Sequence, residues 1–165
     1  MADAENRSKI LEAEQNGEWE SYISLHPRAQ RIHALAKCEY LFDDDARFWS
    51  LFGETWVTTD WHWISRKELE ALLGCGRDGE ENFMTPQERA EFAQLPDVLT
   101  VHRAYVPGRN EDGFSWTLDR GYAERLVEKG SGSYTHIKEK AVSKSEAFAY
   151  ISRRGESEVI LTERG

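Results

Sequence analysis

Three polar features in the second half of the chain combine residue types that can bind a charged group and transfer one. Arg103 stands within an apolar run, Ser115 and Thr117 end a second run, and Glu156 and Glu158 enter the last one. Because residues two apart in an extended chain point to the same face, the two carboxylates repel each other unless a cation or a ligand uses them. Each feature alone is also typical of an ordinary strand or turn. Their order along the chain is what indicates a site.

The elements that must position these residues are strands and one helix. Runs rich in β-branched or alternating apolar residues predict strands over 98–105, 113–117, 134–142, 147–151 and 158–161. Asp119 is a typical N-cap for a helix that carries Tyr122 and ends at Gly130. Ser115 and Thr117 are therefore expected at a strand end beside a helix N-terminus.

Residues 1–95 are predicted to be mainly helical. Apolar residues spaced three and four apart predict a helix over 28–41 whose apolar face is formed by Ile32, Leu35, Ala36 and Tyr40. Two capping boxes predict two further helix starts, at Ser65–Glu68 and Thr85–Glu88. The second of these helices is expected to run to about Gln94 and to stop before Pro96.

An aromatic cluster lies between these helices and predicts a packed core: Phe48, Trp49, Phe52, Trp56, Trp61 and Trp63. Asp43, Asp44 and Asp45 precede it, and three adjacent carboxylates could bind a metal or begin a helix. We interpret them as a helix start and predict no metal site. His62 has no partner at a ligand spacing and is interpreted as structural.

Composition and charge limit the possible functions. Among 165 residues, 30 are acidic and 21 are basic, and residues 1–98 hold 20 of the acidic and 10 of the basic ones. No clustered basic face is available for nucleic acid, whereas the acidic half could meet a basic protein or aid solubility. Cys38 and Cys75 are too few and too far apart for a disulfide framework or a cysteine zinc site. With no apolar segment long enough for a membrane span or signal, a cytoplasmic protein is expected.

The polar features occur in an order that is similar to a known family signature. The segments 101–103, 114–117 and 155–161 resemble the Arg, Ser-x-Ser/Thr and Glu-x-Glu motifs of cholera-toxin-like mono-ADP-ribosyltransferases. The resemblance covers roughly residues 98–162, and the final Gly-Glu-x-Glu-Val-Ile-Leu is its most specific part. The stretch from Phe83 to Arg120 also resembles sequence segments of small bacterial and phage proteins, which indicates a mobile-element origin.

The resemblance implies that NAD is the substrate and assigns a role to each polar residue. Arg103 would hold a phosphate and ribose of NAD, Ser115 would brace the nicotinamide ribose, and Thr117 would support the sheet beside the cleft. Glu158 would bind the 2′-hydroxyl and stabilise the positive charge that develops as nicotinamide leaves. Glu156 would orient or deprotonate an acceptor, which in this family is arginine. Tyr134 would stack on nicotinamide.

The sequence patterns predict an α+β protein with a helical N-terminal half, and the resemblance implies that this half packs on a mixed, split β-sheet of the ADP-ribosyltransferase type. The expected regions are a helical, acidic one over 1–97 and a β-rich NAD-binding core over 98–165, forming one compact unit. The predicted function is transfer of ADP-ribose from NAD to a protein side chain. The alternatives are water or a nucleic-acid base as acceptor, an inactive member that binds or inhibits a protein, and an unrelated α+β domain.

Overall fold

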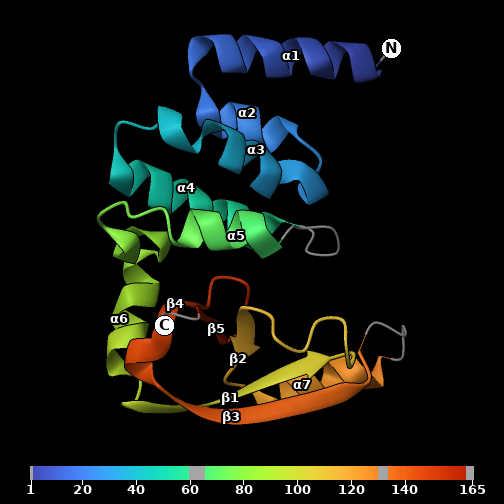
Figure 1. The fold of residues 1–165 in the computed structure, drawn as a ribbon, viewed down its shortest axis with the longest axis vertical. Helices are drawn as coiled ribbons and strands as arrows, with labels where there is room; N and C mark the ends of the chain where they lie inside the picture. Colours follow the sequence, from blue (N-terminus) through green and yellow to red (C-terminus); the bar gives the residue numbers. More distant parts are fainter. Residues whose placement is uncertain (1, 60–65, 130–133, 163–165) are drawn as a thin grey trace. The chain divides into compact units, whose positions relative to one another are not determined.

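The chain folds into two compact units, Met1–Phe83 and Met84–Gly165. The computed structural model in Figure 1 describes residues 2–59, 66–129 and 134–162. The first unit is helical and the second holds a β-sheet, so the predicted α+β class is confirmed. No helix in the described ranges is both long and apolar enough to span a membrane.

The first unit is a set of helices around an aromatic core. Its α-helices are α1 (Ala2–Asn16), α2 (Trp19–Leu25), α3 (Arg31–Cys38), α4 (Asp45–Thr58) and α5 (Arg66–Leu73), and its 3₁₀ turns are η1 (Arg28–Gln30), η2 (Glu39–Leu41) and η4 (Glu80–Phe83). The core is formed by Phe48, Trp49, Phe52, Trp56 and Phe83, each at most 1% exposed. Their rings pack mainly edge to face, which aromatic quadrupoles favour. The aromatic cluster is therefore core, as predicted for its described members; Trp61, His62 and Trp63 lie outside the described residues.

The helix predicted over 28–41 is divided into η1, α3 and η2. Ile32 and Leu35 are buried as predicted, but Tyr40 is 74% exposed, so its placement on the apolar face was wrong. The reason is that the chain leaves α-helical geometry after Cys38, and a 3₁₀ turn has a shorter period than the α-helix used for the prediction. Asp44 caps α4 by accepting from the Arg47 amide, which confirms the helix start. Ser65, of the first capping box, lies outside the described residues.

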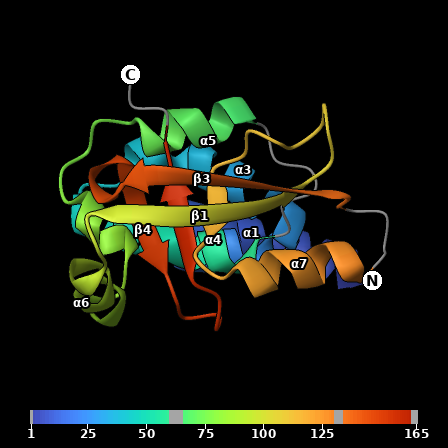
Figure 2. The same ribbon diagram turned by 90° about the horizontal axis from the view of Figure 1, so that it is seen from below.

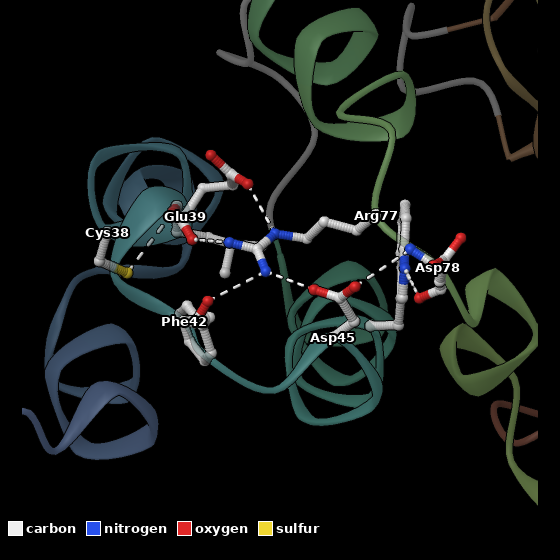
Figure 3. A network of polar contacts seen from close by, with 8 residues as sticks. Cys38, Glu39, Phe42, Asp45, Arg77 and Asp78 are labelled. Atoms are coloured by element: carbon white, nitrogen blue, oxygen red, sulfur yellow. Dashed lines mark hydrogen bonds and ion pairs between the residues drawn. The ribbon is translucent and has the colours of Figure 1, made fainter.

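Arg77 joins three segments of this unit through one guanidinium group (Figure 3). Its Nε donates to Glu39 Oε1 over 2.7 Å and its Nη2 to the Glu39 carbonyl over 2.6 Å. Its Nη1 donates to Asp45 Oδ1 over 2.6 Å and to the Phe42 carbonyl over 3.0 Å. The group also lies over the Phe48 ring, 5.0 Å from its centroid. A planar fork with several donors can satisfy these acceptors together, which an ammonium group cannot do.

We therefore expect Arg77→Met to lower the free energy of unfolding by about 2–3 kcal/mol, because two partly buried carboxylates and two carbonyls lose their donor. Arg77→Lys is expected to recover only part of this loss. Urea unfolding followed by tryptophan fluorescence measures the effect, and Arg28→Met at an exposed arginine is the control. Equal stability of the Arg77→Met and Arg28→Met proteins would contradict a structural role for the network.

In its described residues, the second unit is a five-stranded sheet with two α-helices. Its strands are β1 (Val98–Tyr105), β2 (Ser115–Thr117), β3 (His136–Ser143), β4 (Ala147–Ile151) and β5 (Glu158–Leu161), and its helices are α6 (Pro86–Gln94), α7 (Arg120–Glu128) and the 3₁₀ turn η5 (Lys144–Glu146). The strand order is β3-β1-β2-β5-β4. Helix α7 packs along β1 with further contacts to β3 and β2 (Figure 2). In the strand order, β2 is central and β1 and β5 lie next to it, and these three strands carry the predicted site.

The prediction of a mixed sheet was wrong, because all four strand pairings of the described sheet are antiparallel. The helical crossover from β2 through α7 does lead to a strand in the same direction as β2. It places that strand, β3, on the far side of β1, so the two parallel strands are not neighbours. The register between β1 and β2 is limited to the pair His102 and Thr117.

Helix α6 was grouped with the helical region in the sequence analysis, whereas the structure divides the chain ahead of it. The predicted capping box is present: Thr85 accepts from the Glu88 amide and Glu88 from the Thr85 amide. Glu88, 1% exposed, also accepts from the Arg153 guanidinium, over 2.8 Å at Oε2, and from the amides of Ser152 and Arg153. These bonds attach α6 to the residues that directly follow β4. All the residues of this network lie in the second unit.

The Glu88 network makes stability depend on pH. Burial raises the pKa of Glu88, but the hydrogen bonds from Arg153 and from the backbone outweigh it and hold the pKa below its usual value of 4.5. The folded protein then binds fewer protons than the unfolded chain in acid, so this stabilisation is complete above the unfolded pKa and is lost as pH falls through the lower folded value. We expect Glu88→Gln to cost about 3 kcal/mol at neutral pH and to flatten the decline of stability below pH 4.5.

Urea unfolding at a series of pH values tests this, with the exposed Glu128→Gln as a matched control. If the Glu88→Gln protein loses stability in acid as steeply as the wild type, Glu88 is not the group responsible.

Candidate functional site

Three buried polar side chains form a row across the three strands β1, β2 and β5. In the pairing register, His102 lies opposite Thr117, and Thr117 lies opposite Glu158. The three residues are 6%, 7% and 6% exposed. Directly paired residues of antiparallel strands share a face, so these side chains lie on one face of the sheet, and Ser115 lies there too. A buried carboxylate in a row with a hydroxyl and an imidazole forms a buried polar site in the sheet.

Arg103 begins on the other face. It is one residue after His102, so its Cβ lies on the face of Trp116 and Val159, which are the neighbours across the sheet. The structure therefore brings Ser115, Thr117 and Glu158 together and approaches them with Arg103 from the opposite side. The backbone therefore does not place Arg103, Ser115 and Glu158 on one face of the sheet, as their predicted convergence requires.

The guanidinium of Arg103 reaches back toward β2 where the β1–β2 pairing has ended. Its Nε donates to the Asn110 carbonyl over 2.9 Å and its Nη1 donates to the Ser115 carbonyl. A Cβ added to Gly113 would lie 2.0 Å from Nη2, so only a glycine permits this close approach. The side chain thus takes the place of strand-to-strand hydrogen bonds in the gap and fixes the 106–114 loop against β2.

The guanidinium of Arg103 is largely buried. Its hydrogen bonds to Asn110 and Ser115 are both made to main-chain carbonyl oxygens. Burial lowers the pKa of Arg103, while the groups of Tyr134, Glu158 and Asp112 act in the opposite direction. Those three groups therefore lie within electrostatic range of the guanidinium. A buried cation bonded to carbonyl oxygens is stabilised further when an anion binds to it.

Glu156 is held from two sides at the edge of the row. Tyr122 of α7 forms a hydrogen bond with the Glu156 carboxylate, and burial together with this bond raises the pKa of Tyr122. Arg154 Nη2 lies 3.4 Å from Glu156 Oε1. Glu158 also raises the pKa of Tyr122, so this carboxylate lies within electrostatic range of the tyrosine as well. Both glutamates thus act on one tyrosine of α7.

Tyr134 lies immediately before β3 and is half-buried. The Thr135 amide that follows it donates to the Tyr105 carbonyl over 3.0 Å, which attaches this segment to the end of β1. Tyr134 acts to raise the pKa of Arg103, so it lies within electrostatic range of the guanidinium. Its predicted stacking role stays a prediction.

His102 was not selected by the sequence analysis. Its Nδ1 is buried without a hydrogen-bond partner and lies 3.3 Å from Glu139 Oε2, which Arg120 of α7 also approaches at 3.4 Å. The sequence signal for His102 is a histidine within an apolar strand. This signal does not by itself indicate a site, because only the register shows that His102 lies in the row with Thr117 and Glu158.

The described residues contain no group of three or more His, Cys, Asp or Glu side chains arranged to hold a metal ion. Asp45, one of the three adjacent aspartates, instead accepts from Arg77 and from the Asp78 amide. Comparison with protein-family models, with curated proteins and with solved structures finds no match for this chain. The site must therefore be interpreted from its own geometry.

Proposed function

We propose that the protein transfers ADP-ribose from NAD to an arginine side chain of a target protein. The observation that carries this proposal is the largely buried guanidinium of Arg103, which is bonded to main-chain carbonyls in the β1–β2 gap and lies within electrostatic range of Glu158. A dinucleotide supplies both a phosphate for a cation and a ribose for a carboxylate. The family signature over 98–162 agrees with this pairing.

In the proposed complex, Arg103 binds a phosphate of NAD through the N–H groups that the Asn110 and Ser115 carbonyls do not use. Ser115 and Tyr134 contact the nicotinamide ribose and ring. Thr117, paired with Glu158 across β2 and β5, keeps the two strands in register beside the gap. These groups orient the donor and do not take part in bond making.

Glu158 performs the electrostatic part of the reaction. As the bond between the ribose C1′ and the nicotinamide nitrogen breaks, positive charge develops on the ribose, and a fixed carboxylate in a buried site stabilises it. Glu156, two residues earlier and more exposed, accepts a proton from the incoming nucleophile. Its contact with Arg154 supports a guanidinium as the group it recognises.

The test is release of nicotinamide when the purified full chain is incubated with NAD alone and with agmatine as a small guanidinium acceptor. The expected result is slow release with NAD alone and faster release, with ADP-ribosyl-agmatine formed, when agmatine is present. If nicotinamide is released under neither condition, the proposal is contradicted, whether or not the protein binds NAD.

A catalytically inactive relative that binds or inhibits a protein is the second candidate. It is favoured by the engagement of Arg103 Nε and Nη1 with main-chain carbonyls. It is also favoured by exposed Tyr40 and Leu41 in a first unit that carries 17 acidic and 9 basic residues, which suits a basic partner. Absence of nicotinamide release, together with binding of a basic protein, would select this function.

A further inference from the structure

The turn between β4 and β5 folds one arginine back onto the candidate acceptor carboxylate. The Gly155 amide donates to the Ser152 carbonyl over 2.8 Å, and Gly155 has a φ of +73°, which favours glycine. This turn brings Arg154 Nη2 to 3.4 Å from Glu156 Oε1. The Arg154 side chain is 39% exposed and the Glu156 side chain 20% exposed, so a bound substrate can reach both.

The adjacent arginine is committed elsewhere. Arg153 donates to Glu88 through Nε over 3.0 Å and through Nη2 over 2.8 Å, and Glu88 is almost fully buried. Two arginines that are neighbours in sequence therefore differ in what their guanidinium groups can do. Arg153 is part of the attachment of α6, and Arg154 is the one that meets Glu156.

Glu156 also hydrogen-bonds with Tyr122 of α7. A second partner restricts the rotation of the carboxylate that Arg154 contacts. Glu156 lies in the bend two residues before Glu158, the first residue of β5, so the guanidinium that Glu156 contacts is held close in the chain to the carboxylate proposed to face the ribose.

We propose that Arg154 is a modification site: the chain transfers ADP-ribose from NAD to its own Arg154. This rests on the proposed function. The bond from C1′ to the nicotinamide nitrogen breaks and its electron pair leaves with nicotinamide. The Nη2 lone pair of Arg154 forms the new bond to C1′, and the displaced Nη2 proton passes to Glu156 and then to solvent. An arginine acceptor in a protein target would take the place that Arg154 occupies in the free chain.

The test is incubation of the full chain with NAD, followed by peptide mass spectrometry that locates ADP-ribose. Label is expected on Arg154, and Arg154→Lys is expected to reduce total label at least about 10-fold while nicotinamide release stays within about twofold. Arg125→Lys is the matched control, since Arg125 is an exposed arginine that pairs with Asp119 at 3.2 Å, and it should leave the label unchanged. A mixture of active Arg154→Lys protein and inactive Glu158→Gln protein should leave the latter unlabelled, because the contact is within one chain.

Each outcome is distinct. Label that persists in the Arg154→Lys protein, or label transferred in the mixture, overturns this inference and leaves the proposed function standing. Nicotinamide release without label on Arg154 does the same. Failure of the wild-type chain to release nicotinamide overturns the proposed function, and this inference with it.

Discussion

Glu158→Gln is expected to lower nicotinamide release about 100- to 1,000-fold, with the fold intact. Glutamine has the shape of glutamate and keeps a hydrogen-bonding oxygen, but it removes the negative charge that is proposed to stabilise the ribose as nicotinamide leaves. The side chain is 6% exposed, so water cannot replace that charge effectively. Initial rates of nicotinamide release at saturating NAD measure the effect.

The control separates catalysis from folding. Loss of a charge from a buried strand position can itself change stability, so the unfolding midpoint and NAD binding of the variant are measured beside its rate. Glu128→Gln removes a charge from an exposed position at the end of α7 and should retain full activity. A Glu158→Gln protein that binds NAD and keeps more than about a tenth of the wild-type rate would remove Glu158 from the chemistry.

The strands were predictable because the signals are local. The bounds of β1, β4 and β5 follow from runs of β-branched and apolar residues that end at turn residues. The strand predicted over 113–117 begins two residues later, at Ser115. The reason is that Gly113 is used by Arg103 and accepts from the Trp116 indole over 2.9 Å, contacts that the sequence does not reveal.

The geometry of the site was less predictable because it depends on register. The alternation of a strand shows which residues share a face within that strand, but not which residue of another strand lies opposite. Arg103 and His102 are neighbours, and a shift of one residue between β1 and β2 would exchange their faces. The charge of Arg103 therefore indicated a functional role, whereas no local signal distinguished His102, which the register places in the row with Thr117 and Glu158.

The helical unit shows a similar limit. Apolar periodicity predicted the burial of Ile32 and Leu35, because the α-helical period holds there. It failed at Tyr40, where the 3₁₀ turn held by Arg77 replaces the α-helix. A long-range contact from the 74–79 loop thus decides local geometry at residues 39–41, and local patterns cannot contain that information.

The second large effect is expected for Glu156→Gln, which should separate transfer from hydrolysis. Glutamine can still accept the Tyr122 hydrogen bond, so the change removes charge and proton-accepting ability with little change of shape. Transfer to agmatine and to Arg154 should fall about 100-fold, because general-base catalysis and recognition of a guanidinium both need the carboxylate. NAD hydrolysis should stay within a few-fold, because Glu158 stabilises the departing state with either nucleophile.

The two activities are measured in one reaction, by the ratio of ADP-ribosyl-agmatine to free ADP-ribose. The Glu156→Gln protein should shift this ratio strongly toward free ADP-ribose, whereas Glu128→Gln should not move it. An equal fall of both products would mean that Glu156 acts on the donor or on the fold and not on the acceptor. Tyr122→Phe supplies the intermediate case: it frees the same carboxylate without removing its charge, so its ratio should lie between those of the wild type and Glu156→Gln. A Tyr122→Phe ratio equal to that of the wild type would show that the charge of Glu156, and not its orientation, selects the acceptor.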